Sequence, residues 1–393
     1  MQFIDLAAQQ RRIRDKIESN ISTILDHGQY IMGPEVKLLE DRLANYVGSK
    51  HALACASGTD ALLLALMAFE VGPGHAIFTS PFTFIATAEV ISLLGATPVF
   101  VDIDPDTFNM DPVGLESAIQ AVKKNDATIH PLPTTNATPG HNSTVLKPRG
   151  VIAVDLFGLL ADYERIEDIC RKHDLLVIED AAQSFGAQLN GKKACSFGDV
   201  GCTSFFPAKP LGGYGDGGMC FTNDPRLIKV MDSIRIHGKG NHKYDYIRLG
   251  VNGRLDTLQA GVLLAKFDIF PDEIERRQQV ANRYTELLQP FSDLQLPTMP
   301  QESKSAWAQY SILAKNREHR LNLQKNLKEA GIPTAIYYPK PLHLQTAFSS
   351  FGYCKGDFPV SEDCAERIFS IPMHPYLAEG QQQKIAQIIG STK

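Results

Sequence analysis

Short, continuous apolar runs alternate with amphipathic segments along the chain as far as residue 269. Runs without polar alternation are typical of strands buried on both faces, and helical segments between them favour a mostly parallel sheet. The pattern therefore predicts an α/β fold. The apolar runs lie at residues 51–55, 76–78, 98–102, 150–155, 175–178 and 200–205.

Helices are predicted on both sides of the first strand. Residues 13–47 have helical periodicity with a break at residues 28–34, where Gly33 and Pro34 separate two helices. A strongly apolar helix is predicted at residues 61–69, directly after the first strand.

The pattern changes after residue 269. A charged amphipathic helix is predicted at residues 273–288, and another at residues 320–331 lies between strand-like runs at residues 306–313 and 334–338. The chain is therefore expected to form two units. The predicted domains are a large one of residues 1–269 and a smaller α+β one of residues 270–393.

Residues 125–149 break the alternation within the large domain. The segment is rich in Pro, Thr and Asn and has almost no apolar periodicity. Because a short loop would suffice at this point, we interpret the segment as a mobile surface insertion.

Two residues point to pyridoxal phosphate chemistry. Lys209 lies in the glycine-rich run 205–218, one predicted strand after Asp180. Taken alone, such a lysine is usually a solvated charge, and a strand-end Asp is often a helix N-cap. Together they match two needs of the cofactor: an amine for a Schiff base and an anion beside the pyridine nitrogen. We predict that Lys209 binds the aldehyde and moves the proton, and that Asp180 pairs with the nitrogen.

Five further residues are candidate cofactor contacts. Gly58 and Thr59 lie between a strand and a helix, where backbone N–H groups bind anions, and Ser204 lies five residues before Lys209. These three residues are predicted to bind the phosphate. Gln183 is predicted to contact the phenolic oxygen, and Phe84 to stack on the ring. A common βα turn, a solvent-facing amide and a core aromatic are the alternative interpretations.

Taken together, these motifs resemble the DegT/StrS-type sugar aminotransferases, pyridoxal phosphate enzymes of fold type I. The resemblance covers nearly the whole chain. It implies the fold of aspartate aminotransferase, a large mostly parallel-sheet domain with a smaller α+β C-terminal domain. The matching segments are residues 28–36, 56–62, 100–106, 178–183, 204–218, 251–260 and 338–377.

The resemblance also implies partners. In such enzymes the asparagine matching Asn252 reaches the phosphate from the neighbouring subunit, which implies a homodimer with shared active sites. Arg254, Tyr337 and His343 are candidate substrate contacts. Within the family, the motifs are most similar to those of aminotransferases that use L-glutamate and a UDP-2-acetamido-3-keto-hexuronic acid in O-antigen and polysaccharide synthesis. Leu159 and Tyr337 depart from the pattern of many relatives, which leaves the sugar open.

Three other functions are weighed. Amination at C4 of a UDP- or dTDP-linked 4-keto-6-deoxy sugar would use the same chemistry. Sugar-dehydrating relatives replace the Schiff-base lysine with histidine, so Lys209 argues against that reaction. A regulatory or binding protein of the same fold would not need Asp180, Gln183, Ser204 and Lys209 together.

Composition limits the partners and the cellular location that are expected for the protein. The net charge is −5 and no basic tract stands out, so neither nucleic acid nor an anionic membrane is expected as a partner. No apolar run approaches the roughly 20 residues that span a bilayer, and the N-terminus is unlike a signal peptide, so we expect a cytoplasmic protein. The seven cysteines are scattered and form no CxxC pair, so we expect no metal site and no disulfide framework.

Overall fold

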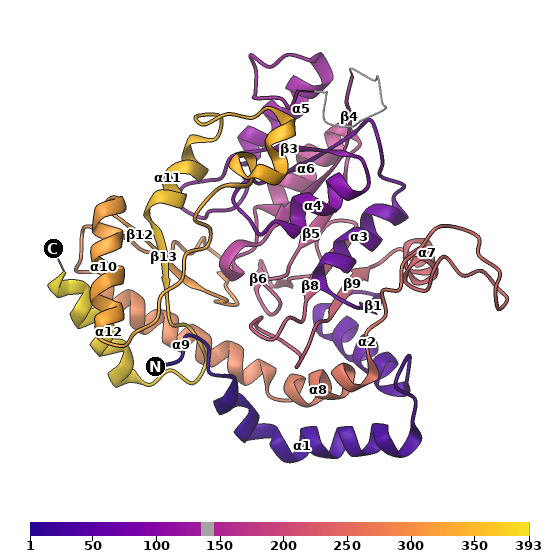
Figure 1. Ribbon diagram of the computed structural model, residues 1–393, viewed down its shortest axis with the longest axis horizontal. Coiled ribbons are helices and arrows are strands. Elements are labelled where there is room, and N and C mark those ends of the chain that lie inside the picture. Colours follow the sequence, from indigo (N-terminus) through magenta and orange to yellow (C-terminus); the bar gives the residue numbers. More distant parts are fainter. Residues whose placement is uncertain (135–144, 393) are drawn as a thin grey trace.

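The computed structural model describes residues 1–134 and 145–392 of the chain. Its centre is a seven-stranded sheet in the order β1-β9-β8-β5-β4-β2-β3 (Figure 1). Strands β8, β5, β4, β2 and β3 are parallel neighbours, and β9 runs antiparallel between β1 and β8. The predicted α/β fold is therefore confirmed. The strands are β1 (His51–Cys55), β2 (His75–Thr79), β3 (Thr97–Phe100), β4 (Lys147–Val154), β5 (Leu176–Asp180), β8 (Val200–Ser204) and β9 (Gly218–Thr222).

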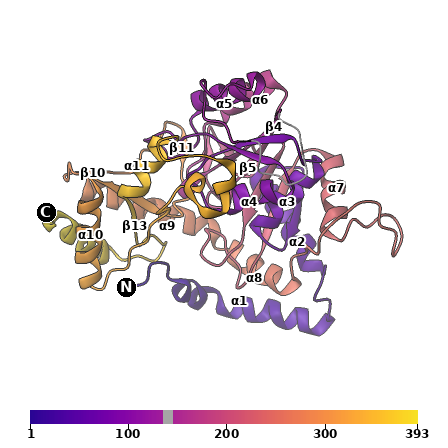
Figure 2. The same cartoon turned by 45° about the horizontal axis from the view of Figure 1, so that its top comes forward.

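Helices cover both faces of this sheet (Figures 1 and 2). Successive strand side chains point to opposite faces, so Val177 joins one buried cluster while Leu176 and Ile178 join the other. The first face carries α2 (Pro34–Val47), α5 (Pro112–Lys124), α6 (Tyr163–His173) and α8 (Thr257–Phe267). The second carries α3 (Gly58–Ala68), α4 (Ala86–Leu93) and α7 (Pro225–Arg235).

The C-terminal part forms a second core around an antiparallel three-stranded sheet. In Figure 1 it lies to one side of the large sheet. The predicted boundary at residues 269–270 stays a prediction. The elements are α9 (Phe270–Leu288), β10 (Leu294–Gln295), β12 (Tyr310–Ala314), α10 (Arg317–Glu329), α11 (Pro359–Arg367), β13 (Ile368–Ile371) and α12 (Glu379–Ser391).

The remaining elements connect these parts. Helix α1 (Leu6–His27) packs Ile13 and Ile17 against α8. Among the helices of the described ranges, none is both long and apolar enough to cross a membrane. The short elements are η2 (Leu156–Gly158), β6 (Gln188–Leu189), β7 (Lys192–Lys193), β11 (Ser303–Lys304), η3 (Leu342–Leu344) and η4 (Thr346–Phe351).

Two expected strands differ from the structure. Residues 306–309 are not extended, because Trp307 has a φ of 48° and the N–H groups of Ala306 and Ala308 donate to the η2 turn instead; the strand β12 begins only at Tyr310. Residues 334–338 contribute a single bridge, between Ala335 and Ser370.

The segment predicted as an insertion is shorter than expected. Strand β4 begins at Lys147, inside the predicted range 125–149. Before it, His130 bonds the carbonyl oxygen of Phe100 at 2.7 Å and so ties this part of the segment to β3. Residues 135–144, on which the rest of that prediction depends, lie outside the described residues.

Candidate active site

The predicted cofactor residues meet at one edge of the sheet. Asp180 ends β5 and Ser204 ends β8, and these strands are parallel neighbours. Strand β1 runs in the same direction, since both β1 and β8 are antiparallel to β9. Gly58, which follows β1, therefore joins the edge where open α/β sheets bind ligands.

Asp180 is buried, and both of its carboxyl oxygens accept hydrogen bonds. Its side chain is only 6 % exposed, and Oδ2 accepts a 2.8 Å hydrogen bond from the Thr87 hydroxyl. Oδ1 accepts from the backbone N–H of Ala182 at 3.2 Å. Burial raises the pKa of Asp180, while Thr87, Ala182 and the charge of Lys209 oppose the rise. A bound cation at this place would favour the charged carboxylate further.

Lys209 lies in the turn after β8, where its N–H donates to Phe206 O at 2.9 Å. The side chain retains some exposed surface, yet protein atoms crowd the amine, and this burial lowers its pKa, against the opposing charge of Asp180. A lowered pKa increases the fraction of neutral amine, which is the form that attacks a carbonyl.

The first turn of α3 forms a cradle for an anion. Ser57 caps this helix by accepting from Asp60 N, which leaves the N–H groups of Gly58 and Thr59 for a ligand. A side chain at Gly58 would not fit, because its Cβ would come within 2.6 Å of the Ser204 Cβ. The close approach brings the Ser204 hydroxyl to the same helix terminus, so the three predicted phosphate residues lie together.

Gln183 and Phe84 are the two remaining candidate cofactor contacts. Gln183 Oε1 accepts from Phe157 N at 2.8 Å, and its Nε2 donates to the Tyr338 hydroxyl at 3.2 Å. Phe84 precedes α4 and is 55 % exposed, although it is a large aromatic. An exposed ring three residues before Thr87 fits stacking on a bound ligand better than it fits a core position.

Helix α8 holds the glycine-rich loop after Lys209. Gln259 Oε1 accepts from Tyr214 N at 2.8 Å. The amine of Lys266, which is fully buried, lies 3.5 Å from Gly213 O and 4.3 Å from the centre of the Tyr214 ring. The loop that carries the candidate Schiff-base lysine is therefore fixed from outside the sheet.

Asn252 and Arg254 form a pair near the same edge. Asn252 Oδ1 accepts from Arg254 Nε at 3.1 Å and from Nη2 at 2.5 Å. Gly253, between them, accepts from Ala56 N at 3.0 Å, which sets the pair next to the strand end that precedes Gly58. Contact of Asn252 with the phosphate of a neighbouring subunit stays a prediction.

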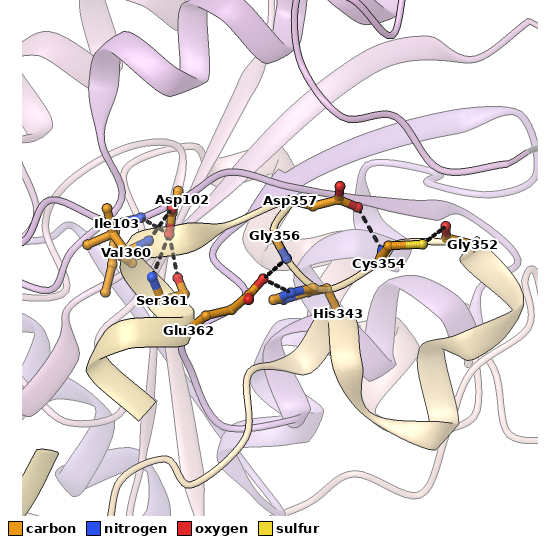
Figure 3. A network of polar contacts seen from close by, with 10 residues as sticks. All are labelled: Asp102, Ile103, His343, Gly352, Cys354, Gly356, Asp357, Val360, Ser361 and Glu362. Carbon is orange, nitrogen blue, oxygen red and sulfur yellow. Dashed lines mark hydrogen bonds and ion pairs between the residues drawn. The ribbon is translucent and has the colours of Figure 1, made fainter. Parts of the chain in front are cut away.

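The structure places His343 in a buried polar network (Figure 3), and neither Lys209 nor Asp180 belongs to that network. His343 is 1 % exposed, and its Nε2 lies 3.0 Å from Glu362 Oε1. In the same view Asp102, after β3, accepts from Ser361 at the start of α11. These contacts hold the η3–α11 region on the large sheet. A substrate contact by His343 would therefore need these groups to move.

Tyr337, unlike His343, connects to a predicted cofactor residue through its neighbour Tyr338. Its ring contacts those of Phe3 and Tyr338, and Tyr338 in turn accepts from Gln183. Leu159 is buried, and its carbonyl accepts from Asn109. No group of three or more His, Cys, Asp or Glu side chains within the described ranges is arranged to hold a metal ion.

Thr87 and Tyr338 are site residues that sequence reasoning missed. Thr87 bonds Asp180 across 93 positions, and Gln183 bonds Tyr338 across 155. Tyr338 begins the matched segment 338–377, and Thr87 lies one helical turn after the singled-out Phe84. Neither residue was assigned a role from these positions.

Comparison with protein families matches residues 11–390 to the DegT/DnrJ/EryC1/StrS aminotransferase family. The chain belongs to this family. A relative from Pseudomonas aeruginosa, UDP-2-acetamido-2-deoxy-3-oxo-D-glucuronate aminotransferase, is 47 % identical over 96 % of both chains. UDP-N-acetyl-3-dehydro-alpha-D-glucosamine 3-aminotransferase from Acidithiobacillus ferrooxidans is 41 % identical over 99 % of this chain and 97 % of the relative.

A solved structure identifies the cofactor chemistry. NtdA from Bacillus subtilis, with bound cofactor PMP, superposes with a TM-score of 0.84 at 26 % identity, covering 96 % of this chain and 81 % of NtdA. This family member is therefore a pyridoxal-phosphate-dependent aminotransferase. When bound, the cofactor supplies an aldehyde that links amines and a ring that accepts electrons. The buried Asp180 fits the pyridine nitrogen of the cofactor, the crowded amine of Lys209 fits its aldehyde, and the helix terminus at Gly58 fits its phosphate.

Proposed function

We propose that this enzyme transfers the amino group of L-glutamate to C3 of a UDP-2-acetamido-3-keto-hexuronic acid. The observation that carries the proposal is the 47 % identity, over 96 % of each chain, to an enzyme named for a UDP-linked 3-oxo-glucuronate. A second relative is named for 3-amination of a UDP sugar without the acid group. The product would serve O-antigen or polysaccharide synthesis.

Residues at the sheet edge are assigned to the cofactor in this proposal. Lys209 would hold the aldehyde and, once released, carry the proton between the substrate carbon and the cofactor. Asp180 would keep the pyridine nitrogen protonated, as its buried carboxylate supports. Gly58, Thr59 and Ser204 would bind the phosphate.

Arg254 is the proposed partner of a substrate carboxylate. Its guanidinium bonds only a neutral amide, Asn252, among the contacts described for it. A guanidinium fork binds a carboxylate through two parallel hydrogen bonds. Both L-glutamate and a hexuronic acid carry such a group, whereas the non-acid sugar of the second relative does not.

We infer a homodimer as the working form. Large apolar side chains are exposed on the arm, residues 237–251, which extends from the sheet after α7 in Figure 1. Exposed apolar groups gathered in one place are typical of interaction surfaces. The arm ends next to Asn252 and Arg254, so a second subunit on this surface would adjoin the site.

Visible absorption spectra test the first half of the reaction. In wild type, L-glutamate is expected to change the spectrum of the bound cofactor, and a suitable keto-sugar is expected to restore it. Lys209→Ala is expected to show neither change. A wild-type spectrum that never responds to glutamate would favour a binding protein of the same fold.

A sugar panel tests the second half. Restoration by the UDP-linked 3-keto-hexuronic acid at a lower concentration than by the 3-keto-glucosamine analogue is the expected result. Restoration only by a UDP- or dTDP-linked 4-keto-6-deoxy sugar would replace C3 by C4. Detection of the amino-sugar product by mass spectrometry completes the assignment.

A further inference from the structure

We propose that Asp155 and Glu179 share one proton beneath the active site and thereby position the turn that carries Asp180 and Gln183. Neither residue belongs to the set assigned to cofactor or substrate. The positioning role rests on the cofactor site proposed above, whereas the shared proton does not.

Register brings the two acids together. Ala153 of β4 and Glu179 of β5 are paired in the sheet. Asp155 lies two positions after Ala153 and so keeps to the same face as Glu179, since side chains alternate along a strand. Asp180, the next residue, faces the opposite way. The pair therefore lies behind the site.

Asp155 is enclosed by donors. It is fully buried, and its Oδ1 accepts from Ala161 N at 3.0 Å and from the Tyr163 hydroxyl at 2.9 Å. Its Oδ2 accepts from the Ser184 hydroxyl at 2.7 Å. The carboxyl group of Glu179, on the neighbouring strand and the same face of the sheet, is its acidic neighbour.

Glu179 is enclosed in the same manner. It is also fully buried, and its two oxygens accept from Cys195 N at 2.6 Å and from Phe197 N at 2.9 Å. Two carboxylates on the same face of neighbouring strands repel each other in a buried pocket, and a proton on one of them removes this repulsion. The position of Asp155 beside Glu179 therefore favours at least one proton on the pair.

The surroundings offer no other source of compensation. The ionisable groups facing the pair are Tyr163 on α6 and Cys195 after β7, both of them acids. Within the described ranges no Lys, Arg or His side chain is bonded to either carboxyl. Burial raises the pKa of both, that of Asp155 to about 7.

The pair connects to the site by two routes. Ser184, which donates to Asp155, directly follows Gln183. The N–H of Asp155 donates to Asp180 O at 3.1 Å, and Phe157 of the same turn donates to Gln183. Loss of the proton would place two repelling charges in the interior and displace the turn that these bonds hold.

Asp155→Asn is the sharp test, because its amide can replace the shared proton. The amide N–H₂ would donate to Glu179 and to Ser184, whose hydroxyl can rotate to accept. Infrared spectra of the cofactor-free protein at pH 6 are expected to contain a protonated-carboxyl band in wild type that is missing in the variant. Asp162→Asn, at the exposed cap of α6, is the matched control and should keep the band.

The pH dependence of cofactor binding tests positioning. In wild type the dissociation constant of pyridoxal phosphate is expected to rise about tenfold between pH 6 and pH 9, as the pair loses its proton, and by less than about twofold in Asp155→Asn. A purely structural acid would leave the two profiles parallel.

Each outcome bears on one part of the proposal. A wild-type spectrum without the band, or a band that survives in Asp155→Asn, overturns the shared proton. A lost band with parallel binding profiles overturns the positioning role. If wild type fails to bind pyridoxal phosphate at any pH while the band behaves as expected, the assigned cofactor site is wrong and the shared proton stands.

Discussion

At the scale of single residues, a hydrogen bond from Thr87 stabilises the charged form of the Asp180 carboxyl group. The hydroxyl donates to the carboxylate at 2.8 Å, and this bond opposes the rise in the pKa of Asp180 that burial causes. A hydrogen bond to a charged group contributes about 1.5–3 kcal/mol, and about 1.4 kcal/mol corresponds to one pKa unit. In Thr87→Val, Asp180 should therefore protonate at a pH higher by about one unit or more.

The measurement is the retention of cofactor absorbance as the pH is lowered. The variant should release the cofactor at a higher pH than wild type, because the protonated acid no longer pairs with the pyridine nitrogen. Thr83→Val is the control, since the Thr83 hydroxyl contacts Thr87 at 3.2 Å but not Asp180. Equal acid limits in wild type and Thr87→Val would contradict the assigned role of Asp180.

Gly58 tests the phosphate cradle at the same scale. Gly58→Ala would force its Cβ to within 2.6 Å of the Ser204 Cβ, so the helix terminus and the serine must separate. Such overpacking costs about 1–3 kcal/mol and should weaken cofactor binding by about five- to 150-fold. Gly380→Ala, where a Cβ meets nothing within 4 Å, is the control and should leave binding unchanged. Fluorescence titration of the cofactor-free protein measures both.

The sequence predicted those site residues that belong to local motifs. Lys209 in its glycine-rich loop and Gly58 between strand and helix could be singled out because their neighbours in the chain determine their setting. Thr87 and Tyr338 could not, because their partners are 93 and 155 positions away. His343 was selected by its motif, yet its neighbours in space, Glu362 above all, make it a buried network residue.

At the scale of elements, helix α8 contains a buried cation, Lys266, whose burial lowers the free energy of unfolding by an amount that can be measured. Lys266 is 1 % exposed, and burial lowers its pKa from 10.5 to about 8, against the attraction of Glu273. The unfolded chain therefore binds more protons between about pH 8 and 10, so the free energy of unfolding should rise with pH in this range. The cost at pH 7 is on the order of 3 kcal/mol.

Lys266→Met should remove this pH dependence. At pH 7 the variant is expected to unfold at a higher denaturant concentration than wild type, and the difference should shrink towards pH 10. The kcat should fall meanwhile, because Gly213 and Tyr214 of the Lys209 loop lose a contact. A constant stability difference across this range would show that the amine titrates normally.

Element prediction succeeded where burial determines the pattern and failed where tertiary contacts override it. The strands β1, β2, β5 and β8 are apolar on both faces and were found close to their observed bounds. Strand β9 begins at Gly218 and was missed because glycines preceding it were interpreted as loop. The run at 306–313 was placed too early because the η2 turn takes the N–H groups of Ala306 and Ala308.

At the scale of the whole molecule, the sequence predicted family, fold and cofactor together, while the assembly remains to be tested. The arm, residues 237–251, is the segment at which dimer formation can be tested most directly. Backbone hydrogen bonds such as Ile247 N to Gly238 O at 2.9 Å fold the arm, yet four of its large apolar side chains are exposed. They are Tyr244, Tyr246, Ile247 and Leu249. Burial of a leucine side chain contributes about 1.5–3 kcal/mol, so a subunit interface would account for this exposure.

Leu249→Glu should shift the enzyme from dimer to monomer. Leu249 is 90 % exposed, and a charge there would have to be buried on association without a partner. Sedimentation velocity over a range of concentrations measures the shift, and activity should fall with it if Asn252 completes the neighbouring site. Leu93→Glu is the control, because Leu93 is 72 % exposed at the end of α4, away from the arm. A Leu249→Glu protein that remains dimeric would exclude the arm from the interface, and a fully active monomer would exclude shared active sites.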